Sequence, residues 1–177
     1  MRGLVAGYTG VDYALLGVVA VVAGIVFYSA WYVYDIGKAI GGIYAGRILA
    51  YGLWFIGAPL AASLIRRPLA AFLGEFLGAL VETVIPTVGG FTNMIYGFFQ
   101  GLASELGYAL LGYRRWGILA GALAGALAAP PCIALDAVLF AEIYPAVVTA
   151  LLLVVAMVSG AVYGALAALV ADKLRWQ

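Results

Sequence analysis

Residues 11–34 read VDYALLGVVAVVAGIVFYSAWYVY, and Asp12 is the only charged residue among them. A hydrocarbon core of about 30 Å needs about 20 apolar residues in a helix, so this segment is long enough to cross a bilayer. The segment is too long for a secretory signal, and neither Asp12 nor the closing aromatic cluster resembles a cleavage region. It is therefore predicted to be a membrane-spanning helix of the mature protein.

The same length criterion divides the rest of the chain into five further apolar segments. The breaks between segments carry turn residues: Gly41-Gly42, Arg66-Arg67-Pro68, Pro86 with Gly89-Gly90, Arg114-Arg115, and the stretch around Glu142 and Pro145. We expect an all-α integral membrane protein with one membrane domain over 1–177. Its six helices are expected at about 11–34, 43–65, 69–85, 91–113, 117–140 and 145–171.

The composition excludes several classes of protein. Hydrophobic residues make up 67% of the chain and charged residues 10%, against about 25% charged residues in soluble domains. A net charge of +1 gives no basic stripe for nucleic acid. The chain has no histidine and a single cysteine, Cys132, so hydrolase and redox-metal functions are disfavoured, and neither a metal site nor a cofactor is expected.

Basic residues in the loops predict the orientation, because they favour the cytoplasmic side. One side of the membrane collects Arg2, Arg66, Arg67, Arg114, Arg115, Lys173 and Arg175, and the other holds Lys38 and Arg47. Both termini are therefore expected in the cytoplasm of a multi-pass plasma-membrane protein.

Small residues recur at four-residue spacing, which allows helices to approach closely in lipid. The expected fifth helix carries Gly117, Gly121, Gly125 and Ala129, and the expected sixth carries Ala156, Gly160, Gly164 and Ala168. Ala20 and Gly24 form a smaller patch of this kind on the first helix. The pattern favours packing within the bundle over docking of a partner.

Ionisable residues inside a bilayer are costly and usually face the bundle interior or a wet cavity. Glu75 and Glu82 share one face of the expected third helix, and Glu105 follows Asn93, Tyr96 and Gln100 on the fourth. At 1.5 Å per residue, Glu82 lies near the outer end with Asn93, Tyr96 and Gln100, where they can line an outward-facing pocket. Glu75 and Glu105 lie deeper, either as its floor or as a buried structural network.

Aromatic residues supply a second set of candidates. Tyr51 and Trp54 lie on one helical face and predict either a binding wall or simple packing. Tyr28, Trp31, Tyr32 and Tyr34 are expected to form an interfacial belt. Arg47 can reach the outer interface or pair with Glu82. Asp136 follows a kink predicted at Pro130-Pro131 and is expected in an outer loop rather than a pocket.

Five motifs carry a resemblance to a known family. They are Tyr51-Gly-Leu-Trp-Phe-Ile, Ile65-Arg-Arg-Pro, Gly74-Glu-Phe-Leu-Gly-Ala-Leu-Val-Glu82, Gly97-Phe-Phe-Gln-Gly-Leu-Ala-Ser-Glu105 and Tyr113-Arg-Arg. In this order they resemble the S-components of energy-coupling-factor (ECF) transporters, specifically the Yko-type thiamine/hydroxymethylpyrimidine branch. The resemblance extends from the first helix through Arg115 and weakens beyond it.

The resemblance implies a six-helix bundle of S-component type that binds a vitamin near the outer face. It also implies a transmembrane coupling subunit and cytoplasmic ATPases as partners, with Ala20 and Gly24 as the docking patch. The chain has no phosphate-binding Gly-x-x-x-x-Gly-Lys-Ser/Thr motif, so it is expected to be a transporter subunit and not itself an ATPase.

Thiamine or its pyrimidine precursor suits the candidate residues. A thiazolium cation is bound by carboxylate and aromatic faces, and an aminopyrimidine by groups that donate and accept hydrogen bonds. Arg47 leaves a phosphorylated ligand open, although the unphosphorylated one is favoured. Three alternatives remain: another vitamin or heterocycle, a structural or assembly subunit, and an intramembrane enzyme that uses Glu75 and Glu105.

Overall fold

The computed structural model describes residues 7–87 and 89–175, and all regular elements within them are helical. In chain order they are α1 (Gly10–Ala50), the 3-10 helix η1 (Tyr51–Phe55), α2 (Gly57–Ile65), α3 (Ala70–Val84), α4 (Thr92–Leu110), α5 (Ile118–Leu127), α6 (Ala129–Leu139) and α7 (Ala146–Arg175). The expected all-α class is confirmed. Arg2, one of the basic residues used for the orientation, lies outside the described residues.

The chain reverses inside α1 at the glycine pair that predicts a turn. Gly41 and Gly42 leave the helical region, and Gly42 adopts a φ of 76°, which a side chain would disfavour. Gly37 and Gly46 then face each other so closely that a Cβ on Gly37 would lie 2.7 Å from the Cα of Gly46. The first helix continues beyond Tyr34. Asp35 and Lys38 end the apolar stretch but do not end the helix.

Two other expected helices are interrupted. Between Ala50 and Gly57, the second expected helix is interrupted by the 3-10 helix η1. Pro59, in the first turn of α2, cannot donate a backbone hydrogen bond to the turn before it. The fifth segment breaks between α5 and α6 just before Pro130 and Pro131, as the proline pair predicts.

Helices α5 and α7 pack through their glycines. A Cβ placed on Gly125 would collide with the carbonyl of Gly160, and one on Gly121 would collide with that of Gly164. The backbones therefore touch along the predicted small-residue faces, which confirms that these residues serve packing within the bundle.

The small-residue patch on α1 also packs internally. Ala20 and Gly24 are buried, and a Cβ on Gly24 would lie 2.6 Å from a methyl group of Val81 and 3.0 Å from the carbonyl of Gly78. Docking through Ala20 and Gly24 stays a prediction, and because α3 covers Gly24, a partner subunit could contact it only if α3 moved.

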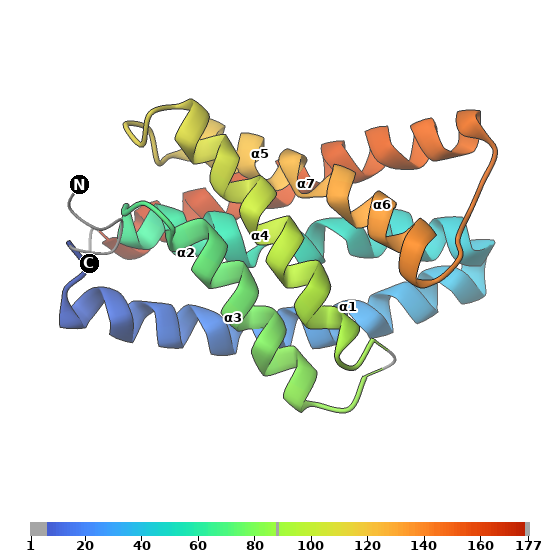
Figure 1. Ribbon diagram of the computed structural model, residues 1–177, viewed down its shortest axis with the longest axis horizontal. Coiled ribbons are helices and arrows are strands. Elements are labelled where there is room, and N and C mark those ends of the chain that lie inside the picture. Colours follow the sequence, from blue (N-terminus) through green and yellow to red (C-terminus); the bar gives the residue numbers. More distant parts are fainter. Residues whose placement is uncertain (1–6, 88, 176–177) are drawn as a thin grey trace.

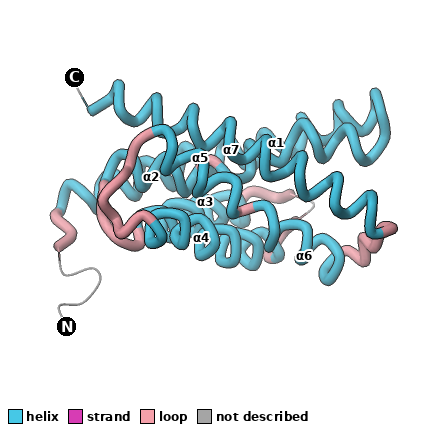
Figure 2. The backbone as a smooth tube through the Cα atoms, turned by 90° about the horizontal axis from the view of Figure 1, so that it is seen from above, coloured by secondary structure: helices cyan, strands magenta, loops and turns pink. Residues whose placement is uncertain are grey.

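The helices form an elongated bundle in which α1 begins and α7 ends at the same end (Figure 1). Helices α3 and α4 pack against each other and cross the long helices obliquely (Figures 1 and 2). At the shared end, Arg66 pairs with Asp172 at 2.6 Å, and Arg175 donates to the carbonyl of Leu64 at 2.8 Å. These contacts join the end of α7 to the last turn of α2 and to the turn that follows it.

Three helical stretches of the described chain are long and apolar enough to cross a membrane: Gly10–Ile65, Ile118–Leu139 and Ala146–Arg175. The first contains the reversal at Gly41–Gly42. With 15 residues, α3 is about 22 Å long, shorter than a hydrocarbon core of about 30 Å. Six complete crossings therefore stay a prediction, as does the orientation of the termini.

Candidate functional site

A cavity of about 260 Å³ opens among α1, η1, α3, α4 and α6, at the end of the bundle opposite the basic turns. Six of the eight binding residues expected from the sequence line it: Tyr51, Trp54, Glu82, Asn93, Tyr96 and Gln100. Residues from three separate elements, which the sequence spacing predicts at the outer end, therefore lie around one cavity. Whether they bind a ligand stays a prediction.

One wall of the cavity is aromatic. The rings of Trp31 and Trp54 meet edge to face with centroids 5.2 Å apart, and Tyr34 lies 6.3 Å from Trp54. The indole nitrogen of Trp54 donates to the carbonyl of Phe27 at 3.1 Å, which fixes the ring on α1. Trp31 and Tyr34 were assigned to an interfacial belt, and this assignment is corrected because both line the cavity.

The Glu82 carboxylate projects from α3 into this aromatic wall. Its Oε1 accepts a hydrogen bond from the indole nitrogen of Trp31 at 2.8 Å, and the side chain is 3% exposed. Within the described chain, no cation pairs with Glu82. A charge on a buried carboxyl group with a neutral donor and no cation is costly, and a cationic ligand would stabilise that charged form.

Another part of the cavity lining carries amide groups on α4. Asn93 donates to the hydroxyl of Thr87 at 2.9 Å, which ties the start of α4 to the segment before it. Gln100 lies two turns deeper and is 4% exposed. Amides offer both donors and acceptors, the pattern that the edge of a heterocycle requires.

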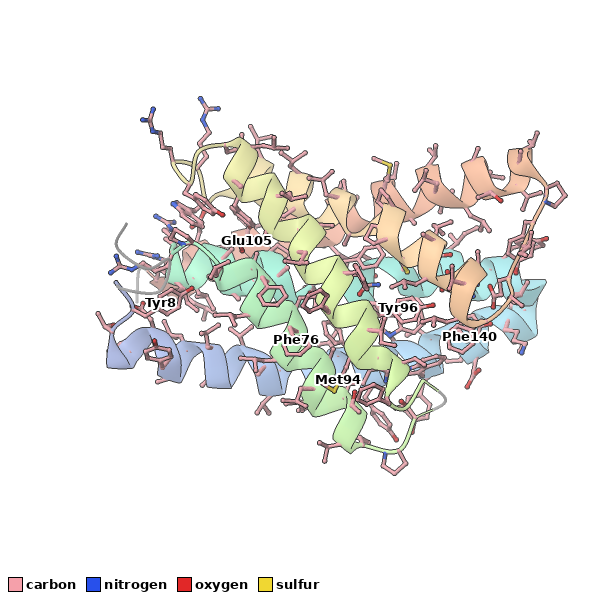
Figure 3. The ribbon with its side chains drawn as sticks, in the orientation of Figure 1. Tyr8, Phe76, Met94, Tyr96, Glu105 and Phe140 are labelled. Carbon is pink, nitrogen blue, oxygen red and sulfur yellow. The ribbon has the colours of Figure 1, made fainter. Side chains whose placement is uncertain are left out.

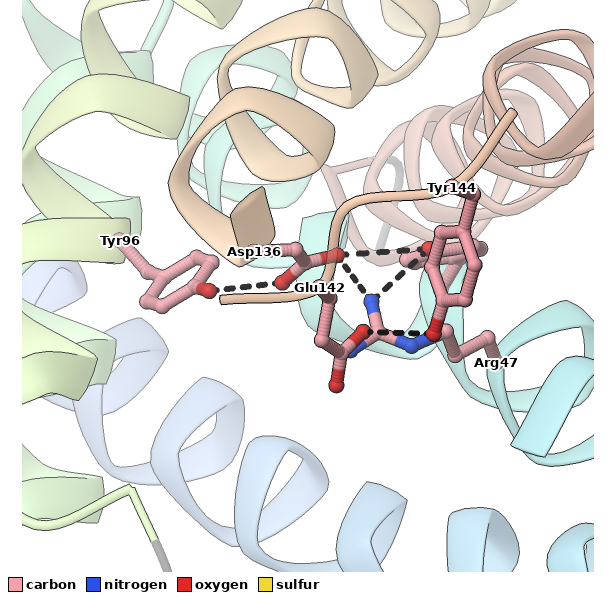
Figure 4. A network of polar contacts seen from close by, with 6 residues as sticks. Arg47, Tyr96, Asp136, Glu142 and Tyr144 are labelled. Atoms are coloured by element: carbon pink, nitrogen blue, oxygen red, sulfur yellow. Dashed lines mark hydrogen bonds and ion pairs between the residues drawn. The ribbon is translucent and has the colours of Figure 1, made fainter. Parts of the chain in front are cut away.

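The far wall is a charged cluster, which we call the Arg47 clamp and define as Arg47, Asp136 and Glu142 (Figure 4). The two guanidinium Nη atoms pair with the two carboxylates, one with Asp136 and one with Glu142. The phenols of Tyr51 and Tyr96 complete the cluster, and Tyr96 donates to Asp136 at 2.6 Å.

The clamp corrects two expectations. Arg47 pairs with Asp136 and Glu142 and not with Glu82. Asp136 lies on α6 and lines the cavity, where an outer loop was expected. The helical break at Pro130-Pro131 redirects the chain so that Asp136 points inward. The segment after α6 then returns over the cavity with Glu142.

Tyr144 supports Glu142 from outside the helices. Its phenol donates to the Glu142 carboxylate at 3.2 Å, and its ring contacts that of Tyr44. Partial burial and then the nearby Glu142 carboxylate raise the pKa of the Tyr144 phenol, so the group keeps its proton and remains a donor.

Glu75 does not line the cavity, and its contacts favour the structural role over the pocket floor. The side chain is fully buried, and its Oε2 accepts a hydrogen bond from the backbone N–H of Ala58 at 2.8 Å. Helix α2 begins without a side-chain cap of its own, so Glu75 satisfies one of its unpaired backbone donors and complements the helix dipole.

Glu105 does the same for α3. Its two carboxylate oxygens accept from the backbone N–H groups of Leu69 and Phe72, at 2.6 and 3.1 Å. Figure 3 shows Glu105 toward the end of the bundle where Tyr8 lies, whereas Tyr96 and Phe140 lie toward the cavity end. Glu75 and Glu105 therefore belong to the structural network that the sequence left open, but they bind backbone groups and not each other.

The cavity is acidic overall. Asp35, Glu82, Asp136 and Glu142 face Lys38 and Arg47, a formal excess of two negative charges. Its ionisable groups are spread along the walls, and no group of three His, Cys, Asp or Glu residues within the described chain is placed to hold a metal ion. The chemistry of the walls suits an organic cation.

Comparison with known proteins agrees with this architecture. The family model described as the permease component of the ABC-type cobalt transport system matches residues 11–131, more than half of the chain. The chain belongs to this family. The match ends inside α6 and covers all of the helices that carry Trp54, Glu82 and Gln100.

A solved structure and a related protein identify the type of transporter subunit more closely. The crystal structure of an S-component of an ECF transporter superposes with a TM-score of 0.87 at 25% identity, and the match covers 96% of this chain and 87% of that one. The putative HMP/thiamine permease protein YkoE of Bacillus subtilis (strain 168) is 42% identical over 55 residues, 31% of this chain and 28% of its own length. The protein is therefore an ECF S-component, with a local relationship to the Yko-type branch.

Proposed function

We propose that this S-component captures thiamine or its hydroxymethylpyrimidine precursor and delivers it to an ATP-driven uptake complex. The observation that carries the proposal is the Glu82 carboxylate, which pairs with no cation of the described chain and is held by Trp31 beside the partly buried ring of Trp54 in an acidic cavity. A thiazolium cation between a carboxylate and an aromatic face gains both Coulomb and cation–π energy.

The remaining walls fit the rest of such a ligand. Asn93 and Gln100 offer donors and acceptors to an aminopyrimidine edge. The cavity volume of about 260 Å³ lies just below the range of about 300–1,000 Å³ for pockets of drug-sized ligands, which favours a small vitamin over a large cofactor. The local match to YkoE supports the same ligand class.

The transport role requires other subunits. The chain carries no nucleotide-binding motif, so a transmembrane coupling subunit and cytoplasmic ATPases would supply the energy. With the basic end of the bundle in the cytoplasm, the cavity would open toward the outside, as capture of a nutrient requires.

Calorimetry on the purified full chain tests the proposal. Thiamine, hydroxymethylpyrimidine and Co²⁺ are titrated separately, and mass spectrometry identifies small molecules carried through purification. We expect binding of thiamine or the pyrimidine and no saturable binding of Co²⁺. Binding of Co²⁺ alone would replace the proposal with a metal cargo. A different bound vitamin or heterocycle would keep the S-component role and change its substrate.

The same preparation separates a binding subunit from a purely structural one. A ligand that binds only the folded state raises the unfolding temperature as its concentration increases. We expect thiamine to do so, whereas an assembly subunit would show no shift with any of the probes.

A further inference from the structure

Two cations line this cavity, Lys38 and Arg47, and the Arg47 guanidinium has the geometry that matches phosphate oxygens. The structure instead commits it to the protein. One Nη atom binds Asp136 and the Tyr51 phenol, and the other binds Glu142. The side chain is 8% exposed, so these pairs lie out of bulk water.

We propose that the Arg47 clamp determines specificity: Asp136 and Glu142 withhold Arg47 from the ligand, so the site accepts a cationic vitamin and rejects its phosphate ester. This inference rests on the proposed function and names the form of the substrate. It assigns Asp136 and Glu142 a role in selection although neither needs to touch the ligand.

Two physical costs oppose a phosphate ester. The added negative charge would enter a cavity that already has a formal excess of two negative charges, and like charges at short range repel strongly. To engage the phosphate, Arg47 would also have to leave a buried carboxylate without its partner, which is strongly unfavourable.

Because of where the Arg47 clamp lies, release of Arg47 from a carboxylate would change the main cavity. Arg47, Asp136 and Glu142 also line a second, smaller cavity of about 90 Å³ beneath the segment between α6 and α7. The clamp is thus the wall between two cavities, with space on both sides of the guanidinium. An Arg47 freed from one carboxylate has room to turn toward a ligand in the main cavity.

Calorimetry with thiamine and thiamine monophosphate, on the full chain, tests the inference. The wild type is expected to bind the monophosphate at least about tenfold more weakly than thiamine, since like charges at short range repel each other. Glu142→Gln is expected to shift this ratio toward the monophosphate by about tenfold, because it removes one negative charge and releases one side of Arg47. Asp136→Asn should shift the ratio in the same direction, and it serves if the first variant does not fold.

Asp35→Asn is the matched control. Asp35 lines the same cavity and makes no ion pair within the described chain, so its loss removes one negative charge without freeing Arg47. Its effect on the ratio should be clearly smaller than that of Glu142→Gln. The gain should also disappear in the double variant Glu142→Gln/Arg47→Gln.

Three results would overturn the inference while leaving thiamine capture intact: equal binding of both probes by the wild type, equal shifts in Glu142→Gln and Asp35→Asn, or a gain that persists without Arg47. If thiamine itself does not bind the wild type, the proposed function fails and this inference fails with it.

Discussion

The two ends of the bundle place buried carboxylates in different ways. At the basic end, Glu105 accepts hydrogen bonds from the backbone at the start of α3, and midway along the bundle Glu75 does so for α2. At the cavity end, Glu82 and Asp136 bind side chains and face open space. Carboxylates that bind backbone amides stabilise the fold. At the cavity, Arg47 and Tyr96 hold Asp136, whereas Glu82 pairs with no cation of the described chain and remains available to a ligand.

The packing of the two ends differs in the same way. Helices α5 and α7 touch backbone to backbone through glycines, whereas the cavity end is lined by large aromatic side chains such as Trp31 and Trp54, whose rings meet edge to face. A close-packed scaffold therefore supports a cavity of about 260 Å³. Substitutions in the scaffold should affect folding, and those in the cavity should affect binding.

The largest effect on stability is expected from Gly125→Leu in the scaffold. The new side chain would collide with the Gly160 carbonyl on α7, where no rotamer can avoid the facing backbone. Overpacking of this kind costs about 1–3 kcal/mol or more, so the variant should unfold at a much lower temperature or fail to accumulate. Gly17→Leu is the control, because nothing lies within 4 Å of its Cβ position. An equal loss of stability in both variants would show that the close α5–α7 contact at Gly125 contributes no more to stability than the open position at Gly17.

Glu82→Gln should give the largest loss of binding. Removing one charged partner from a desolvated pair costs about 2–5 kcal/mol, so calorimetry should show thiamine affinity at least about tenfold weaker. The amide can still accept from Trp31, so the unfolding temperature without ligand should change little. Unchanged affinity in a folded variant would remove Glu82 from the site.

Glu75→Ala should show the reverse pattern. It leaves the backbone N–H of Ala58 buried without an acceptor, at a cost of about 1–3 kcal/mol of stability. Thermal unfolding should detect this loss, while the folded fraction should bind thiamine with wild-type affinity. A selective loss of affinity at full stability would move the ligand deeper into the bundle, toward Glu75.

The sequence was sufficient where local spacing decides the outcome. Helical periodicity placed Glu82 on one helix and Asn93, Tyr96 and Gln100 on the next, and counting residues from the loops placed all four in the outer half of the bundle. All four line the cavity. The turn at Gly41–Gly42 and the break near Pro130 likewise follow from residues with special backbone geometry.

The sequence was insufficient where partners lie far apart along the chain. Arg47 and Asp136 are 89 positions apart, and their contact depends on the direction in which the proline break turns α6. Periodicity carries no information about that direction. The helix starts held by Glu75 and Glu105 do leave a signal: Ile56 and Leu69 stand at cap positions where Ser, Thr, Asp or Asn is usual, so the acceptor must come from elsewhere.

The smallest effect is expected from the aromatic wall, where Trp54→Ala and Trp54→Phe form a graded pair. An aromatic contact is worth about 0.5–1.5 kcal/mol beyond the burial of its area, so Trp54→Phe should weaken thiamine binding by only about threefold. Trp54→Ala should weaken it further, because it also removes the ring that Trp31 packs against. That loss would loosen the indole that holds Glu82, and the double variant Trp54→Ala/Glu82→Gln should then lose less affinity than the sum of its parts. Full additivity would show that the ligand contacts the wall and the carboxylate independently, without the link through Trp31.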